Sequence, residues 1–184
     1  RLYEEMKRDF ITFIEKSKED ISTIVATTAL TKALRLQQIV SGFVKNDQGV
    51  EVTLFDMPRL TETTQLLEQL TPEHKVILWC AFKHDYVQLS KVCEDLTLKY
   101  AMLTGEQNEK EKNESIDSFR KDPATRVLIA NRRAGGIGIN LTEASYSIVY
   151  SRTFSLGDEL QSEARNYRAG SEVHEKITKI NLVA

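Results

Sequence analysis

The chain has 184 residues, of which 41% are hydrophobic and 28% charged, and its formal net charge at pH 7 is -2. This length suits one compact domain with a sizeable core, with room for a smaller appended segment. The near-neutral balance excludes binding to nucleic acid through overall positive charge, so any basic surface must be local. No apolar run is long enough to span a bilayer, and no membrane partner is expected.

Neither the cysteines nor the histidines are spaced as metal ligands. Cys80 and Cys93 both fall in apolar surroundings, which predicts buried free thiols in a reducing compartment. The three histidines are scattered along the chain, so we expect no metal site.

Residues 1–57 are expected to form a helical lead-in to the main domain. Amphipathic patterns over residues 1–23 and 27–43 predict two helices, the second of which stops near Gly42. A turn signal at residues 46–49 follows, so the stretch up to Pro58 is either a hairpin or a linker.

From residue 58 to residue 184 the pattern alternates between helical stretches and short apolar runs of strand length. The runs are "KVILWCA", "KYAMLT", "TRVLIA", "ASYSIVYS" and the last segment, "HEKITKINLVA". Strands that are apolar on both faces and separated by helices predict an α/β fold, a parallel sheet covered by helices on both faces. Such sheets bind ligands at the carboxyl ends of their strands, so the residues after each strand are the candidates for function.

A glycine-rich segment, "NRRAGGIGINLTEAS", follows the third of these strands. It does not fit a dinucleotide fingerprint, because Leu141 stands where the third glycine belongs, and it lacks the Lys-Ser/Thr pair of a phosphate-binding Walker loop. It is also too short to hold the crossover helix that either motif requires. Two interpretations stay open: an irregular loop at the ligand-facing edge, or an ordinary tight connection.

Two other strands are followed by weaker signals. Thr104 and Gly105 leave a hydroxyl and a bare backbone after "KYAML", which alone indicates only a turn. Phe82, Lys83 and His84 follow the first strand and are typical of a surface loop at the start of a helix.

A helix near the end of the chain carries two arginines on one face. Ser155 and Asp158 form a capping-box pattern at its start. Gln161, Arg165 and Arg168 then recur at helical spacing on the face opposite an apolar stripe. The guanidinium fork matches phosphate oxygens, so the pattern favours phosphate binding as much as a solvated charged face.

In this order the segments resemble the second RecA-like domain of superfamily 2 helicases and translocases, and among these the Swi/Snf-type ATPases. "KVILWCAF" is similar to their motif IV, the stretch from "YAMLTGE" through the glycine-rich segment to motif V, and "QSEARNYRAGS" to motif VI. "LRLQQIVSGF" resembles a segment that leads into this domain. The resemblance covers nearly the whole chain and implies a RecA-like fold in residues 58–184, preceded by the helical or inter-lobe segment 1–57.

The resemblance also implies roles for single residues. Arg165 and Arg168 correspond to arginine fingers that reach ATP on the first RecA-like domain, with Gln161 in support. The motif V loop links nucleotide to nucleic acid, which implies nucleotide contacts at Gly136 and Gly138. The nucleic-acid contacts that it implies are Thr104, Gly105, Arg133, Gly135, Asn140 and Thr142. Ala164, Tyr167 and Ser171 depart from the usual Asp, His and Gln of motif VI, and Arg132 from a common Thr, which leaves the fine tuning of these roles in doubt.

The same resemblance implies a partner lobe. The chain begins at Arg1 without a methionine and carries neither a Walker A lysine nor an acidic Walker B motif. We therefore expect a piece of a longer protein, in which an N-terminal RecA-like lobe holds most of the ATP with its Mg²⁺. The isolated chain should then neither bind ATP tightly nor hydrolyse it. Duplex DNA is the leading substrate class.

Alternatives to a duplex-DNA translocase are a strand-separating helicase on single-stranded DNA or RNA, and a degenerate lobe that serves only as an interaction module. The compact lead-in is similar to that of bacterial or phage enzymes, which would place the protein in the cytoplasm. A eukaryotic source would place it in the nucleus.

Overall fold

In the computed structural model, the structure describes residues 23–45, 50–54, 57–131, 140–152 and 174–183, together with residues 4, 5, 8 and 134. For residues 23–29 it describes the backbone alone. The chain divides into two compact units, Arg1–Arg59 and Leu60–Ala184. Each unit is described below by itself.

The first unit contains one long helix and a hairpin. Helix α2 spans Thr23–Val40 and ends just before Gly42, whose φ of 85° lies in the left-handed region that favours glycine. Strands β1 (Phe43–Lys45) and β2 (Glu51–Thr53) then pair antiparallel. The segment that the sequence left open between a hairpin and a linker is therefore a hairpin.

The second unit is built around a five-stranded sheet in which every neighbouring pair of strands is parallel. Its spatial order is β4-β5-β3-β6-β7. The strands are β3 (Val76–Cys80), β4 (Lys99–Leu103), β5 (Thr125–Asn131), β6 (Tyr146–Val149) and β7 (Thr178–Asn181). The helices are α3 (Pro58–Leu70), α4 (Lys83–Asp95) and α5 (Glu109–Lys121). The predicted parallel α/β sheet is confirmed.

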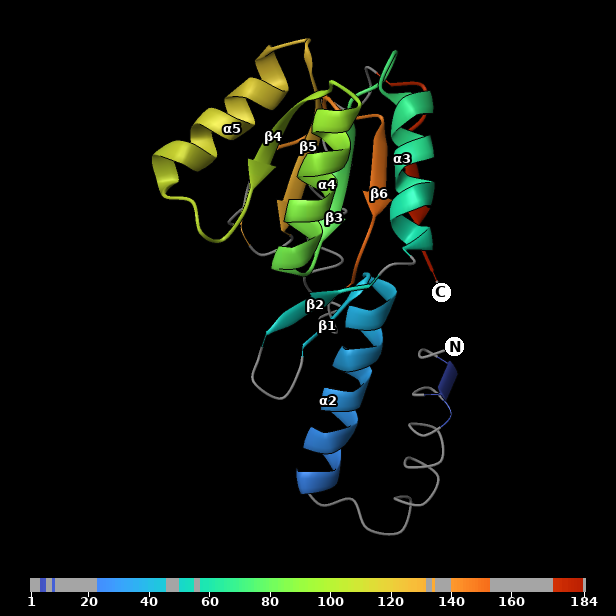
Figure 1. Cartoon of the computed structure of the whole chain (residues 1–184). Helices are drawn as coiled ribbons and strands as arrows, with labels where there is room; N and C mark the ends of the chain where they lie inside the picture. The colour runs from blue at the N-terminus through green and yellow to red at the C-terminus, as the bar shows by residue number, and fades with distance from the viewer. Residues whose placement is uncertain are drawn as a thin grey trace. The chain divides into compact units, whose positions relative to one another are not determined.

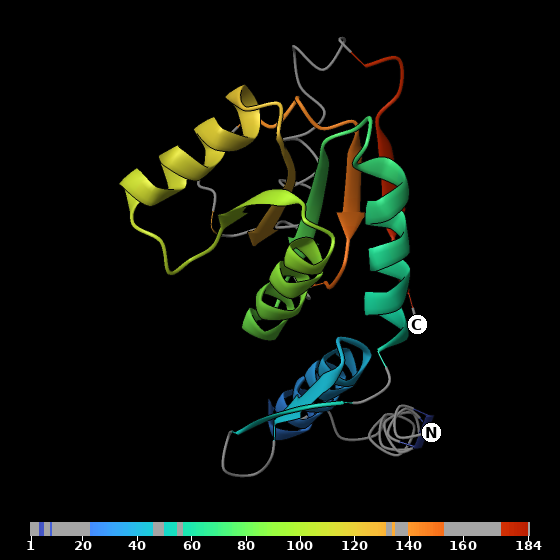
Figure 2. The same cartoon turned by 45° about the horizontal axis from the view of Figure 1, so that its top comes forward.

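Helices cover both faces of this sheet (Figures 1 and 2). Leu67 of α3 and Leu89 of α4 pack with Val76, Leu78 and other side chains on one face. On the opposite face, α5 packs with the alternate side chains of the same strands and with the connection that leads to β6. This second cluster comprises Ile77, Trp79, Ala101, Leu103, Ile116, Phe119, Leu128, Ala130, Ala134, Leu141, Ala144 and Val149. Strand β3 contributes to both clusters because it is buried on both faces, which explains its unbroken apolar sequence.

Cys80 and Cys93 are both buried and neither forms a disulfide, as the sequence predicts. In the part of the chain that the structure describes, no helix is both long enough and apolar enough to cross a membrane.

Candidate functional site

The carboxyl ends of β3, β5 and β6 lie side by side at one end of the strands, because the three strands are adjacent and parallel. The chain moves from β3 outward to β4 and back to β5, and then passes to β6 on the other side of β3. This reversal of strand order is where open α/β sheets bind their ligands. The side chains that emerge there are therefore the first candidates for function.

A buried carboxylate, Asp85, connects two of these strand ends. It lies in the first turn of α4 and is fully buried. Its Oδ2 atom accepts a hydrogen bond from the Phe82 backbone N–H at 3.0 Å and one from the Ser151 hydroxyl at 2.5 Å. The Ser151 oxygen in turn accepts from the backbone N–H of Ala81 at 2.7 Å. Asp85 thus joins the chain just after β3 to the chain just after β6.

The next residue of α4, Tyr86, connects the third strand end. Its hydroxyl oxygen accepts a hydrogen bond from Asn131 Nδ2 at 2.6 Å. Asn131 is the last residue of β5. Burial of the ring raises the pKa of Tyr86 to about 12, so the side chain is a neutral phenol at physiological pH. Tyr86 therefore acts as a hydrogen-bonding contact rather than as an acid or base.

The loop after β4 holds two predicted residues, Thr104 and Gly105. Thr104 is buried, and its backbone N–H donates to Gln107 Oε1 at 2.8 Å. Gly105 is exposed, and a Cβ placed on it would meet no atom within 4 Å. Glu106 beside it forms an ion pair with Lys83 at the start of α4. The loop therefore exposes the Gly105 backbone to solvent, next to the Glu106 carboxylate, whose charge is neutralised by Lys83.

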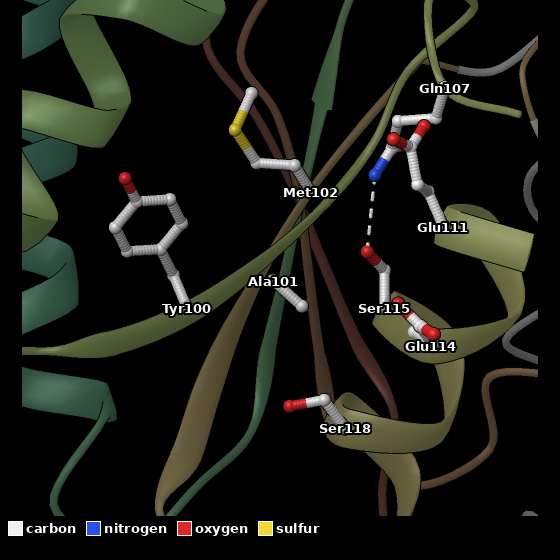
Figure 3. Close-up of a pocket in the computed structure, with 8 residues that line it drawn as sticks. All are labelled: Tyr100, Ala101, Met102, Gln107, Glu111, Glu114, Ser115 and Ser118. Atoms are coloured by element: carbon white, nitrogen blue, oxygen red, sulfur yellow. Dashed lines mark hydrogen bonds between the residues drawn. The ribbon is translucent and has the colours of Figure 1, made fainter.

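An open groove of about 520 Å³ extends from this loop along β4, at the edge of the sheet (Figure 3). Ala101 points toward α5, whereas Tyr100 and Met102 point to the other side of the strand (Figure 3). Gln107 Nε2 donates to Ser115 Oγ at 3.1 Å across one end of the groove. The remaining lining residues, all on α5, are Glu111, Glu114 and Ser118. The groove is lined by no residue that the sequence nominates for a site.

The structure does not bring all the predicted nucleic-acid contacts together. Thr142 is buried four residues before β6 begins, and its carbonyl accepts a hydrogen bond from His174 Nε2 at 2.8 Å. Its neighbour Glu143 accepts from Arg120 Nε at 3.0 Å, in the last turn of α5. These contacts place Thr142 at the amino end of the sheet, opposite Thr104. Nearby, Asn140 Oδ1 is buried and has no hydrogen-bond partner among the residues that the structure describes.

All five predicted nucleotide contacts lie outside the described residues, as do two of the predicted nucleic-acid contacts. They fall in the gaps of the described chain at 132–133, 135–139 and 153–173. The residues affected are Arg133, Gly135, Gly136, Gly138, Gln161, Arg165 and Arg168. Their roles stay predictions.

Sequence reasoning missed the contacts made by α4. The stretch after β3 was expected to be a surface loop that begins a helix, and Lys83 does open α4. His84 and Asp85, however, are buried rather than on the surface. A signal was present in the spacing, because an acidic residue three positions after Phe82 can accept a hydrogen bond from the Phe82 backbone N–H. The partner Ser151 is 66 residues away, and no local pattern identifies it.

Comparisons with known proteins agree with this fold. The helicase conserved C-terminal domain family matches residues 59–170. The ATP-dependent helicase fft2 of Schizosaccharomyces pombe is 32% identical over 124 residues, which are 65% of this chain and 10% of that protein. The chain therefore spans about a tenth of the length of that curated relative.

Two solved structures show the same fold. The crystal structure of the C-terminal part of the Fun30 ATPase domain is 25% identical, with a TM-score of 0.64, over 70% of this chain and 41% of that one. The Sulfolobus solfataricus SWI2/SNF2 ATPase core in complex with dsDNA is 21% identical, with a TM-score of 0.71, over 97% of this chain and 37% of that one. The family match identifies this chain as a member of the helicase conserved C-terminal domain family, and its fold is that of the second RecA-like lobe of these Swi/Snf-type proteins.

Proposed function

We propose that this lobe completes the ATPase site of a duplex-DNA translocase. In this proposal Arg165 and Arg168 reach the phosphates of ATP on a first RecA-like lobe of the same protein, and Gln161 supports them. The first lobe holds most of the ATP and its Mg²⁺. Two guanidinium forks suit the charge that develops on a transferring γ-phosphoryl group.

The observation that carries this proposal is the position of two strand ends. Asn131 is the last residue of β5 and Ser151 lies two residues after the end of β6, and these strands flank β3 on either side, so both residues lie at the carboxyl end of the sheet. The chain continues from Asn131 into the glycine-rich segment and from Ser151 toward the arginine segment. Both predicted nucleotide-contacting segments therefore leave the sheet at its reversal of strand order.

The proposed DNA contact is the backbone of Gly105. It is exposed, and the absence of a side chain lets a phosphate approach closely. Such a contact reads no base sequence, which suits an enzyme that moves along any duplex. A duplex substrate is also supported by the Sulfolobus protein of the same fold, which was solved with double-stranded DNA. Thr142 lies at the other end of a sheet about 16 Å long, so one phosphate cannot touch both residues.

The test is ATPase activity of the full-length protein with duplex DNA, single-stranded DNA, RNA or no nucleic acid. We expect duplex DNA to stimulate hydrolysis most. Arg168→Ala and Arg165→Ala should each lower kcat by about a thousandfold, as expected for an arginine finger. Stimulation chiefly by single strands would favour a strand-separating helicase. Absence of hydrolysis under every condition would overturn the proposal and favour an interaction module.

Two variants serve as controls. Arg168→Lys keeps the charge and removes the planar fork, so it should restore little of the activity. Arg120→Ala removes a half-exposed arginine of α5 that pairs with Glu143, away from the reversal of strand order. Exposed ion pairs contribute little to stability, so this variant should stay folded. Its kcat should therefore stay within about twofold of the wild type.

A further inference from the structure

The first turn of α4 contacts every strand end around the reversal of strand order. Lys83 pairs with Glu106 after β4, Asp85 with Ser151 after β6, and Tyr86 with Asn131 at the end of β5. The rest of α4 covers the sheet through apolar side chains such as Leu89. A helix that only covered the sheet would need that apolar face alone. The polar contacts of its first turn therefore require another explanation.

The hydrogen bonds around Asp85 have a fixed direction. The Ala81 backbone N–H can only donate, so the Ser151 oxygen accepts from it, and the Ser151 proton points to Asp85. Asp85 accepts a second bond from the backbone of Phe82. Each group orients the next, and burial strengthens the series because no water competes with it. The chain after β6 is thereby held at one position relative to β3.

Tyr86 does the same for the chain after β5. Its ring is buried between the sheet and α4, and its hydroxyl receives the Asn131 amide. Asn131 is itself the first residue of the glycine-rich segment. Neighbouring residues of one helical turn thus hold the two points from which the predicted nucleotide-contacting segments leave the sheet.

We propose that Asp85 and Tyr86 are positioning residues for ATP hydrolysis, which fix Ser151 and Asn131, the points from which the chain continues toward the arginine segment and into the glycine-rich segment. The inference rests on the proposed ATPase function. Neither side chain touches ATP.

The experiment compares Ser151→Ala and Tyr86→Phe with two matched variants in the full-length protein. Ser147→Ala removes another buried serine of the same region, which accepts a hydrogen bond from Trp79 Nε1 at 2.9 Å in the middle of β6. Tyr100→Phe removes a hydroxyl that bonds Glu94 at the surface. Ser147→Ala should thus lose comparable stability to Ser151→Ala without touching a strand end.

We expect Ser151→Ala and Tyr86→Phe to lower kcat for ATP about tenfold to hundredfold with little change in KM, because a small misplacement of a catalytic group has that effect. Ser147→Ala and Tyr100→Phe should leave kcat within about twofold. Ser151→Thr, which keeps the hydroxyl, should recover part of the activity. The inference is overturned if Ser151→Ala lowers the melting temperature as Ser147→Ala does and kcat stays unchanged.

Amide hydrogen exchange gives a second readout that does not depend on hydrolysis. Tyr86→Phe should speed exchange at Asn131 and just after it, and Ser151→Ala should do so at Ser151 and Arg152, each without affecting the other. Unchanged exchange in both variants would overturn the inference even in an active enzyme. A wild-type protein without ATPase activity would instead overturn the proposed function, and the positioning role in hydrolysis with it.

Discussion

Gln107 fixes the loop that carries Thr104, since its side-chain oxygen accepts the Thr104 backbone N–H at 2.8 Å while its amide nitrogen donates to Ser115. Gln107 thus bridges Thr104 and Ser115, and the exposed Gly105 lies in the short loop between Thr104 and Gln107. The shape of the loop therefore depends on a side chain that is not itself a predicted contact.

Removing this bridge should weaken DNA binding. We expect Gln107→Ala to raise the DNA concentration for half-maximal ATPase stimulation about fivefold, since one hydrogen bond contributes about 1 kcal/mol. Gln107→Glu keeps the acceptor and can still bond Ser115, but adds a charge that repels phosphate. Its effect should therefore fade at high salt, whereas that of Gln107→Ala should persist. Equal salt dependence in the two variants would contradict this account.

Gly105→Ala separates a structural glycine from a functional one. Because a Cβ at this position meets no atom within 4 Å, the free energy of unfolding should change by less than about 0.5 kcal/mol. A phosphate close to the backbone would clash with it, so DNA stimulation should fall. Gly42→Ala is the contrasting variant, since its Cβ would lie 2.6 Å from Met57 Sδ at a φ of 85°. That substitution should destabilise the chain, which urea unfolding of both variants would measure.

The stability of the second unit should depend on Asp122 below neutral pH. A hydrogen bond from Lys99 and a weaker effect of the Ala124 backbone N–H together lower the pKa of this carboxyl from its ordinary value of 3.8 to about 2. Since the pKa is lower in the folded state, the stabilisation is complete above about pH 4. It is lost as the pH falls from about 4 to 2. Asp122→Asn should therefore lower the urea midpoint at pH 7 and abolish this part of the acid dependence. If the difference in urea midpoint between the wild type and Asp122→Asn stays constant down to pH 2, Asp122 is not the source of the acid dependence.

Cys93 should resist alkylation in the folded protein. Burial raises the pKa of its thiol to about 12, so the reactive thiolate is scarce at pH 8, and the side chain is also inaccessible. Mass spectrometry after iodoacetamide treatment should find Cys93 unlabelled in buffer and labelled in urea. Rapid labelling in buffer would mean that α4 opens locally.

The 184-residue chain alone should not hydrolyse ATP. It lacks a Walker A lysine, and the arginines that we assign to catalysis act on ATP held elsewhere. A phosphate-release measurement with the isolated chain should match buffer, and adding duplex DNA should change nothing. Turnover that Arg168→Ala abolishes would show that the chain holds ATP by itself.

The sheet could be predicted because its signal is local. β3 is apolar at every position since both of its faces are buried, and α5 carries its own cap, in which Asn108 and Glu111 bond each other's backbone. The alternation of strands with helices then predicts that the strands are parallel, whereas their order in the sheet comes from the structure.

The candidate site could be predicted only in part, because its polar contacts join distant segments. Asp85 follows Lys83 in the first turn of a helix, which is the pattern of a surface residue, and its distant partner Ser151 cannot be read from the local sequence. The position of Thr142 could not be predicted for a different reason. It follows the glycine-rich motif closely in sequence, but the connection leads to the amino end of β6 and carries Thr142 away from Thr104.

The central position of β3 has a consequence for synthesis on the ribosome. β3 precedes both of its neighbours in the chain, and the bond between Trp79 and Ser147 joins residues 68 positions apart. At the usual rate of about 5–20 residues per second, a nascent chain waits roughly 3 to 14 s before that bond can form. Until β5 follows, an entirely apolar strand has no partner on either side, which is the condition that recruits chaperones, and its second neighbour, β6, is made later still. The strand that is buried on both faces in the finished protein is therefore one that the growing chain must leave exposed.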